Sequence, residues 1–297
     1  MFISLFLKLG ENKKMAIESI INPMKATERP WEMFFVGLLY STVAIFLGVW
    51  IFRAYSSLIM VFLTVFAAMP FMYKTMKREE EVDVTLKDES KILIQHAKVI
   101  KYLMYLFLGF VVSYSIWFIA LPSSIVQSLF GTQLETIGMI NSKIVGEVIS
   151  PGSIFLQIFL NNFKVLLFSI FFAFFYGAGA IFILTWNASV ISAAIGTFVK
   201  ERIATYAAAA GSAGLFNYFH IFSLGLLRYF IHGVPEIAAY FVGGLAGGII
   251  SVAVINKDLE TDRFKNIMLD AVNLTLIAIG ILVFAALLEV FVTPLFF

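Results

Sequence analysis

The sequence predicts an all-α, polytopic membrane protein. Hydrophobic residues make up 61% of the 297 residues and charged residues only 13%, whereas a soluble domain carries about 25% charged residues. Several apolar runs reach the roughly 20 residues that a helix needs to cross a bilayer. The chain has no cysteine, which excludes disulfides and thiolate chemistry. We therefore expect one transmembrane helical domain, covering residues 34–297, behind an N-terminal segment.

Six long apolar runs predict clear transmembrane helices. They cover residues 34–52, 56–73, 100–121, 165–184, 237–255 and 267–291. Between them, the stretch 187–232 is interrupted by Lys200, Glu201 and Arg202. We expect it to cross once as a re-entrant or broken segment, buried by protein or lining a cavity. Two broken half-spans also fit, and a competing interpretation gives this stretch no net crossing.

The basic residues predict the orientation of the chain in the cell membrane. Lys and Arg are frequent in residues 1–33 and in the loop 74–99, and such segments favour the cytoplasm. The N-terminus is therefore expected inside, without a cleaved signal peptide, and residues 1–33 are expected to lie on the membrane as an amphipathic segment. The loop 122–153 has one basic residue, Lys143, and is expected outside. Its length suggests that it packs back on the spans or presents a partner surface, with a short amphipathic helix from Ile125.

Ionisable residues inside the apolar runs are the candidate site. His232 and Glu236 stand in the stretch His232-Gly233-Val234-Pro235-Glu236, and Glu289 lies in the last run. Because proline suits the first turn of a helix, we expect a break at Gly233 and Val234 and a new span from Pro235. The predicted polar cluster also contains a counter-charge and three amides: Arg228, Asn161, Asn162 and Asn187.

Two interpretations of this cluster stay open. A buried His–Glu pair can fix the packing of a helix break, with a salt bridge to Arg228 between helices. Alternatively, the cluster can relay protons or contact a substrate, because intramembrane carboxylates and imidazoles often mark pathways. Metal binding is less favoured, since the three histidines are scattered and no further ligands are evident.

Four glycines give the run 237–255 a flat face. They are spaced as two overlapping Gly-Xaa-Xaa-Xaa-Gly motifs, formed by Gly243, Gly244, Gly247 and Gly248. Such a face lets helices approach closely. We expect it to serve packing within the monomer in preference to dimerisation.

Enzymatic and nucleotide-binding signatures are missing from the sequence. There is no His-Glu-Xaa-Xaa-His, no Gly-Xaa-Ser-Xaa-Gly and no phosphate-binding loop. Basic residues are not interleaved with aromatic residues on any soluble stretch, which argues against nucleic acid as a partner. We expect no enzyme activity and no cofactor.

The order of several short motifs resembles the stage II sporulation protein M family. These are Asn161-Asn162, Gly177 and Gly179, Asn187, the stretch from His232 to Glu236, and Glu289 with Thr293-Pro294. Two N-terminal segments are similar to those of archaeal members: Asn22-Pro23-Met24-Lys25-Ala26 and Arg29-Pro30-Trp31-Glu32.

The resemblance implies a polytopic scaffold, because the sporulation member holds cell-wall-degrading partners during engulfment. It supplies no catalytic residues. We therefore expect a non-enzymatic scaffold or assembly protein in contact with membrane lipids and protein partners, as a homodimer. The alternatives are a small-solute or ion transporter or channel that uses the polar cluster, and an intramembrane enzyme acting on lipid or peptide.

Overall fold

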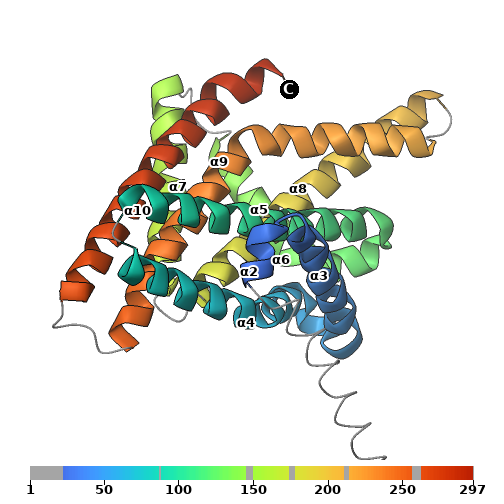
Figure 1. Ribbon diagram of the computed structural model, residues 1–297. Helices are drawn as coiled ribbons and strands as arrows, with labels where there is room; N and C mark the ends of the chain where they lie inside the picture. Colours follow the sequence, from blue (N-terminus) through green and yellow to red (C-terminus); the bar gives the residue numbers. More distant parts are fainter. Residues whose placement is uncertain are drawn as a thin grey trace, which may run out of the picture.

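The structure, a computed structural model, describes residues 23–86, 88–144, 150–173, 178–210, 214–255 and 262–296. These residues form helices joined by short connections, without any strand (Figure 1). The long helices are α3 (Glu32–Ile51), α4 (Ser56–Thr85), α5 (Glu89–Ala120), α6 (Ser123–Ile144), α7 (Pro151–Ala173), α8 (Ala178–Ala210), α9 (Leu215–Ile255) and α10 (Asp262–Leu287). Short elements are α2 (Pro23–Glu28), η1 (Arg53–Tyr55), η2 (Leu288–Val292) and η3 (Thr293–Leu295). Most of the predicted N-terminal segment, residues 1–22, lies outside the described residues.

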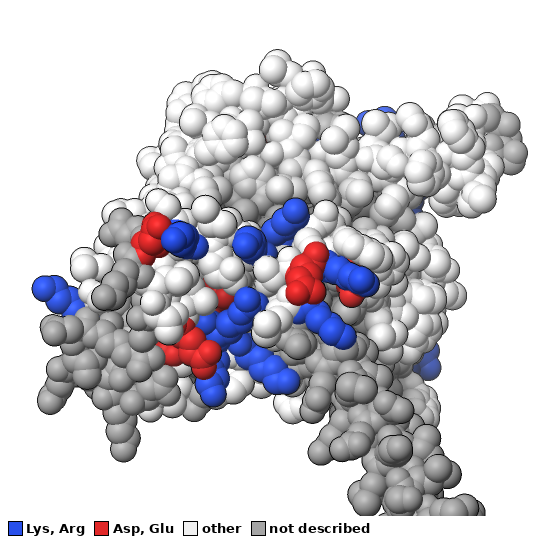
Figure 2. Space-filling model, viewed as in Figure 1, with Lys and Arg blue, Asp and Glu red and all other residues white. Residues whose placement is uncertain are grey.

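Seven of the described helices are long and apolar enough to cross a membrane: α3, α4, α5, α7, α8, α9 and α10. The predicted class, a polytopic all-α membrane protein, is therefore confirmed. The seven helices also equal the predicted six spans plus one crossing. Figure 2 shows the charged side chains of one face gathered over α2, α4 and α5. Much of the same face is uncharged, as expected of a surface in contact with lipid.

The predicted span 165–184 is wrong. It combines the end of α7 with the start of α8, because α7 ends at Ala173 and α8 begins at Ala178. The prediction took Asn162 and Lys164 for the outer end of a span, whereas both lie inside α7. A polar residue within a span ends the apolar pattern without ending the helix when another helix supplies its partner.

The re-entrant or broken segment predicted for 187–232 is not found among the described residues. Residues 187–210 continue α8, which is one helix of 33 residues, and residues 215–232 begin α9. Lys200 and Arg202, which suggested an interruption, stay helical and lie over the rings of Phe118 and Phe198 at 5.1 and 5.4 Å. Cation–π contacts of this kind hold a basic residue in an apolar setting.

The predicted break at Gly233 and Val234 is also wrong, because α9 runs through both residues and through Pro235. Proline removes one backbone donor and bends a helix more often than it ends one when neighbouring helices support the backbone. Figure 1 shows α9 changing direction about halfway along its length. The bend is needed for packing, since 41 residues extend about 60 Å, twice the thickness of a hydrocarbon core.

The second half of α9 forms the centre of the protein. Helix α9 contacts α4, α7, α8 and α10, and nearly all of its buried residues, the four predicted glycines included, lie in this second half. A Cβ on Gly247 would collide with the backbone carbonyl of Ile170 in α7, and one on Gly243 with Leu166 in the same helix. Gly244 faces Ala180 of α8, and Gly248 faces Met76 of α4. The flat face thus serves contacts within the chain.

The segment 122–153 contains α6, which packs on α4 and α8. Leu129 and Phe130 of α6 are fully buried. Gln133, also buried, accepts a hydrogen bond from Ser57 of α4 at 2.7 Å and donates one to Ser189 of α8 at 3.1 Å. The amide therefore ties α6 to both helices, and most of the expected loop is an integral part of the fold.

Candidate functional site

The C-terminal half of the chain brings polar side chains from three directions to one point. His232, Glu236 and Tyr240 are spaced by four residues, so they share one face of α9. Asn162 approaches from α7, and Glu289 from the η2 turn that follows α10. We call these five residues and Thr293 the carboxylate cluster.

Glu236 is the centre of the carboxylate cluster. The hydroxyl group of Tyr240 donates a hydrogen bond of 2.8 Å to Oε1 of Glu236. The side-chain amide of Asn162 is a second hydrogen-bond partner of the same carboxyl group. Tyr240 is fully buried and Asn162 nearly so, while Glu236 is half-buried. Both partners lose their hydrogen bonds if this carboxyl group is removed.

Glu289 brings a second carboxyl group into the neighbourhood of the first. It is near enough to Glu236 for direct electrostatic interaction and is likewise half-buried. Its backbone belongs to a π-helical turn, Leu288–Val292. Single π turns within α-helices are rare and occur frequently at functional sites.

The side chain of His232 links the bend of α9 to the C-terminal turns through a hydrogen bond. Its Nδ1 lies 3.2 Å from the hydroxyl oxygen of Thr293, and that hydroxyl donates to the carbonyl oxygen of Leu288 at 3.2 Å. Because a threonine hydroxyl has a single proton, the Nδ1 of His232 is the donor in the first bond. His232 thus bonds the C-terminal turns, and no hydrogen bond between His232 and Glu236 is found among the described residues.

Three other predicted members lie outside the carboxylate cluster. The guanidinium group of Arg228 lies over the ring of Phe198 at 5.8 Å, and the described residues show no ion pair between Arg228 and either carboxyl group. Asn161 is exposed. Asn187 donates to the carbonyl oxygen of Ile183 in its own helix at 2.9 Å.

The electrostatics of the carboxylate cluster follow from these contacts. The carboxyl groups of Glu236 and Glu289 lie near enough to interact electrostatically, and no basic side chain in the described part of the chain forms an ion pair with either of them. Within a membrane span, such a pair can share a proton or take up a cation. It can equally act as a purely structural joint, since its hydrogen bonds link α7, α9 and the C-terminal turns.

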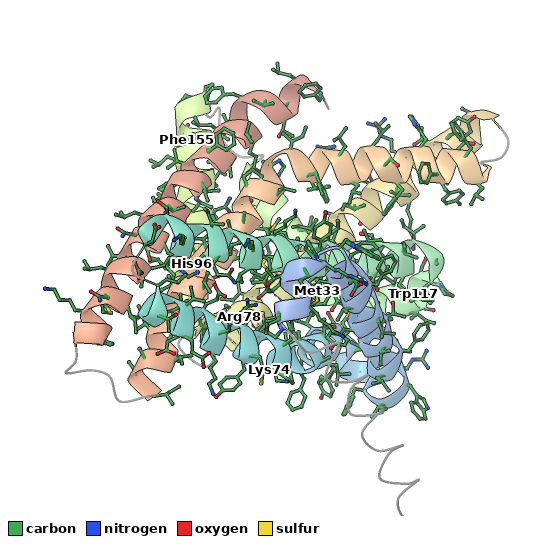
Figure 3. The ribbon with its side chains drawn as sticks, in the orientation of Figure 1. Met33, Lys74, Arg78, His96, Trp117 and Phe155 are labelled. Carbon is green, nitrogen blue, oxygen red and sulfur yellow. The ribbon has the colours of Figure 1, made fainter. Side chains whose placement is uncertain are left out.

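A second polar cluster was missed in the sequence. His96 of α5 and Glu79 of α4 are both buried, and Nδ1 of His96 lies 3.0 Å from Oε2 of Glu79. Gln95 donates to the other oxygen of Glu79 at 3.4 Å. Figure 3 places His96 in the space between α4 and α5. Glu79 and Glu80 belong to the stretch 74–99, which was expected to be a cytoplasmic loop, whereas α4 continues to Thr85 and buries both side chains.

Fold and site together define a polytopic α-helical membrane protein with a polar joint among its C-terminal helices. The sequence profile of one family, Stage II sporulation protein M, matches residues 102–294, which is more than half of the chain. The chain belongs to the stage II sporulation protein M family. The matched range contains the whole carboxylate cluster and excludes Glu79 and His96. No curated protein and no solved structure shows significant similarity to the chain.

Proposed function

We propose that this chain is a non-enzymatic assembly protein of the cell membrane that associates with itself and holds partner proteins in the bilayer. Support comes from the α8–α9 hairpin, which we define as residues 200–210 and 214–230. Figure 1 shows this hairpin reaching away from the other helices. Leu215, Phe216 and Phe219 near its tip are 87%, 77% and 70% exposed. Exposed apolar side chains on a membrane protein contact lipid or a second protein, and their position at the tip of a projecting hairpin makes them available to a partner.

The polar residues of the hairpin favour a protein partner over lipid alone. His220 is exposed and its ring stacks on Phe216, with the ring centroids 6.3 Å apart. Asn217 is half-exposed one turn away. Histidine and asparagine are costly against hydrocarbon and form hydrogen bonds across helix interfaces. A second copy related by a two-fold axis would offer the same groups in return.

Cysteine cross-linking tests self-association without background, because the chain has no cysteine. We expect Phe219→Cys to give a disulfide-linked dimer in membranes under mild oxidation. Phe66→Cys is the matched control, since Phe66 is 74% exposed on α4 and outside the hairpin. Cross-linking of both variants to the same extent, or of neither, would contradict a dimer through the hairpin.

The proposed orientation places the N-terminus in the cytoplasm and the C-terminus outside. Two exposed positions test it: Lys91 at the start of α5 and Ser124 at the start of α6. We expect Ser124→Cys to react with a membrane-impermeant maleimide on intact cells. Lys91→Cys should react only after permeabilisation, and the reverse pattern would invert the topology. The N-terminal segments from Asn22 to Glu32 further support an archaeal-type member of the family.

A second candidate function is proton- or cation-coupled transport. It is favoured by one observation, the proximity of Glu236 to Glu289 on a π turn, where no described basic side chain forms an ion pair with either carboxyl group. Transport requires these carboxyl groups to titrate or to bind a cation during the cycle, whereas assembly requires only their hydrogen bonds. The two functions therefore differ in their response to Glu236→Gln, which keeps the shape of the side chain and removes its charge.

A further inference from the structure

An apolar slot of about 350 Å³ opens between α5, α8 and α9 at the bend of α9. One wall is a stripe of α5 with helical spacing, from Lys101 through Tyr105 and Leu108 to Val111. The opposite wall belongs to α9 and includes Tyr229, Phe230, Gly233, Val234 and Ile237. Its volume lies within the range of small-ligand sites. The slot lies on a different part of α9 from Tyr240 and shares no residue with the carboxylate cluster.

The bend of α9 explains why the slot is open. A Cβ built on Gly233 would meet no atom within 4 Å, so this position has no side chain and no close neighbour. Two residues later, Pro235 lies inside the helix and favours the change of direction. Tyr229 and Phe230 of α9 line the cavity opposite the residues of α5.

The charge of the slot is asymmetric. Lys101 is the one charged residue among its described lining, and no carboxylate lines it. The Lys101 side chain is exposed at the surface. An amphiphile with an anionic head group matches a slot that is apolar along its length and positive at one end.

The length of the slot fits one leaflet of a bilayer. Lys101 and Val111 are ten residues apart on a continuous helix, a rise of about 15 Å. Half of a hydrocarbon core is also about 15 Å thick. α5 is expected to enter the membrane from the cytoplasmic side, so Lys101 would lie near the inner head groups and Val111 near the midplane. This is the direction of an acyl chain in the inner leaflet.

We infer that the slot binds one acyl chain of an anionic membrane phospholipid, with the lipid phosphate at the Lys101 ammonium group. The bound lipid fills the gap between α5 and the first half of α9. It therefore supports the bend of α9 and couples the position of the α8–α9 hairpin to the lipid composition of the membrane. This inference does not depend on the assembly role or on the carboxylate cluster.

Native mass spectrometry of the full-length protein released from nanodiscs tests the inference, with phosphatidylglycerol and phosphatidylcholine as competing probes. We expect wild-type protein to retain one phosphatidylglycerol in preference to phosphatidylcholine. Lys101→Gln should reduce that preference about fivefold, since one basic residue near the surface contributes about 1 kcal/mol toward an anionic lipid. Lys98→Gln, at an exposed lysine outside the slot, should leave the preference unchanged.

Two filling variants test the position of the acyl chain. Gly233→Leu places a side chain in the gap from the α9 side, and Leu108→Trp narrows it from the α5 side without touching the bend. Each should abolish the retained lipid, while Gly280→Leu should not, because Gly280 also has nothing within 4 Å of a built Cβ and lies away on α10. Size-exclusion profiles show which variants fold. Lipid retention by a folded Leu108→Trp variant would overturn the inference, and so would an unchanged preference in Lys101→Gln.

Discussion

Gly109→Ala is expected to lower the free energy of unfolding by about 3 kcal/mol, the upper part of the range for overpacked cores. A Cβ at Gly109 of α5 would collide with the carbonyl oxygen of Phe34 and crowd the backbone of Leu38 in α3. Reciprocally, a Cβ at Gly37 would collide with the carbonyl oxygen of Leu106. These obstacles are backbone atoms of two crossing helices, so no side-chain rotation can relieve the clash.

Alanine is intrinsically a better helix former than glycine by up to about 1 kcal/mol. A loss of stability in Gly109→Ala therefore indicates a steric clash, because helix propensity alone would increase stability. Gly280→Ala is the matched control, because a Cβ there meets nothing within 4 Å. It should be neutral or slightly stabilising. The measurement is a titration with a denaturing detergent followed by tryptophan fluorescence. Equal stability of the two variants would mean that α3 and α5 do not cross closely at these glycines.

The fold class was predictable because long apolar runs indicate helices that are surrounded by lipid and not by water. Twenty-residue apolar runs must satisfy their backbone internally, and helices do so without help from distant residues. The number of helices long and apolar enough to cross a membrane also followed from these runs. Their limits did not, since Asn162 and Lys200 ended the apolar pattern without ending a helix.

The carboxylate cluster was only partly predictable for a related reason. The four-residue spacing from His232 to Glu236 extends to Tyr240, and that spacing was the available signal for the tyrosine. Glu236 and Glu289 are 53 positions apart, and only the path of α9 and α10 brings them together. Arg228 was expected to pair with them from charge alone, but its position on α9 points it at Phe198. The close crossing of α3 and α5 at Gly37 and Gly109 has no recognisable sequence motif, because the two glycines lie on different helices.

Glu236→Leu is expected to lower the free energy of unfolding by about 2–4 kcal/mol. The substitution leaves two polar groups, the Tyr240 hydroxyl and the Asn162 amide, without the acceptor that they now share. Each buried polar group without a partner costs about 1–3 kcal/mol. Tyr240→Phe in the Glu236→Leu background should recover part of the loss, because it removes one of the two groups. An additive double mutant would show that the hydrogen bond between these residues does not stabilise the fold.

Glu236→Gln separates the structural role of the carboxylate cluster from a transport role. Glutamine keeps an oxygen acceptor for Tyr240 and offers an amide nitrogen to the side-chain oxygen of Asn162. It also removes one of two neighbouring carboxyl groups, so its stability should equal or exceed that of the wild type. If the protein assembles partners, Phe219→Cys cross-linking in the Glu236→Gln background should be unchanged and proteoliposomes should show no protein-dependent proton flux. If instead the wild type carries a proton or cation flux that Glu236→Gln abolishes while the variant stays folded, the cluster is a transport site. Because Gln preserves the packing that Leu destroys, the comparison of the two variants assigns the cluster to one role or the other.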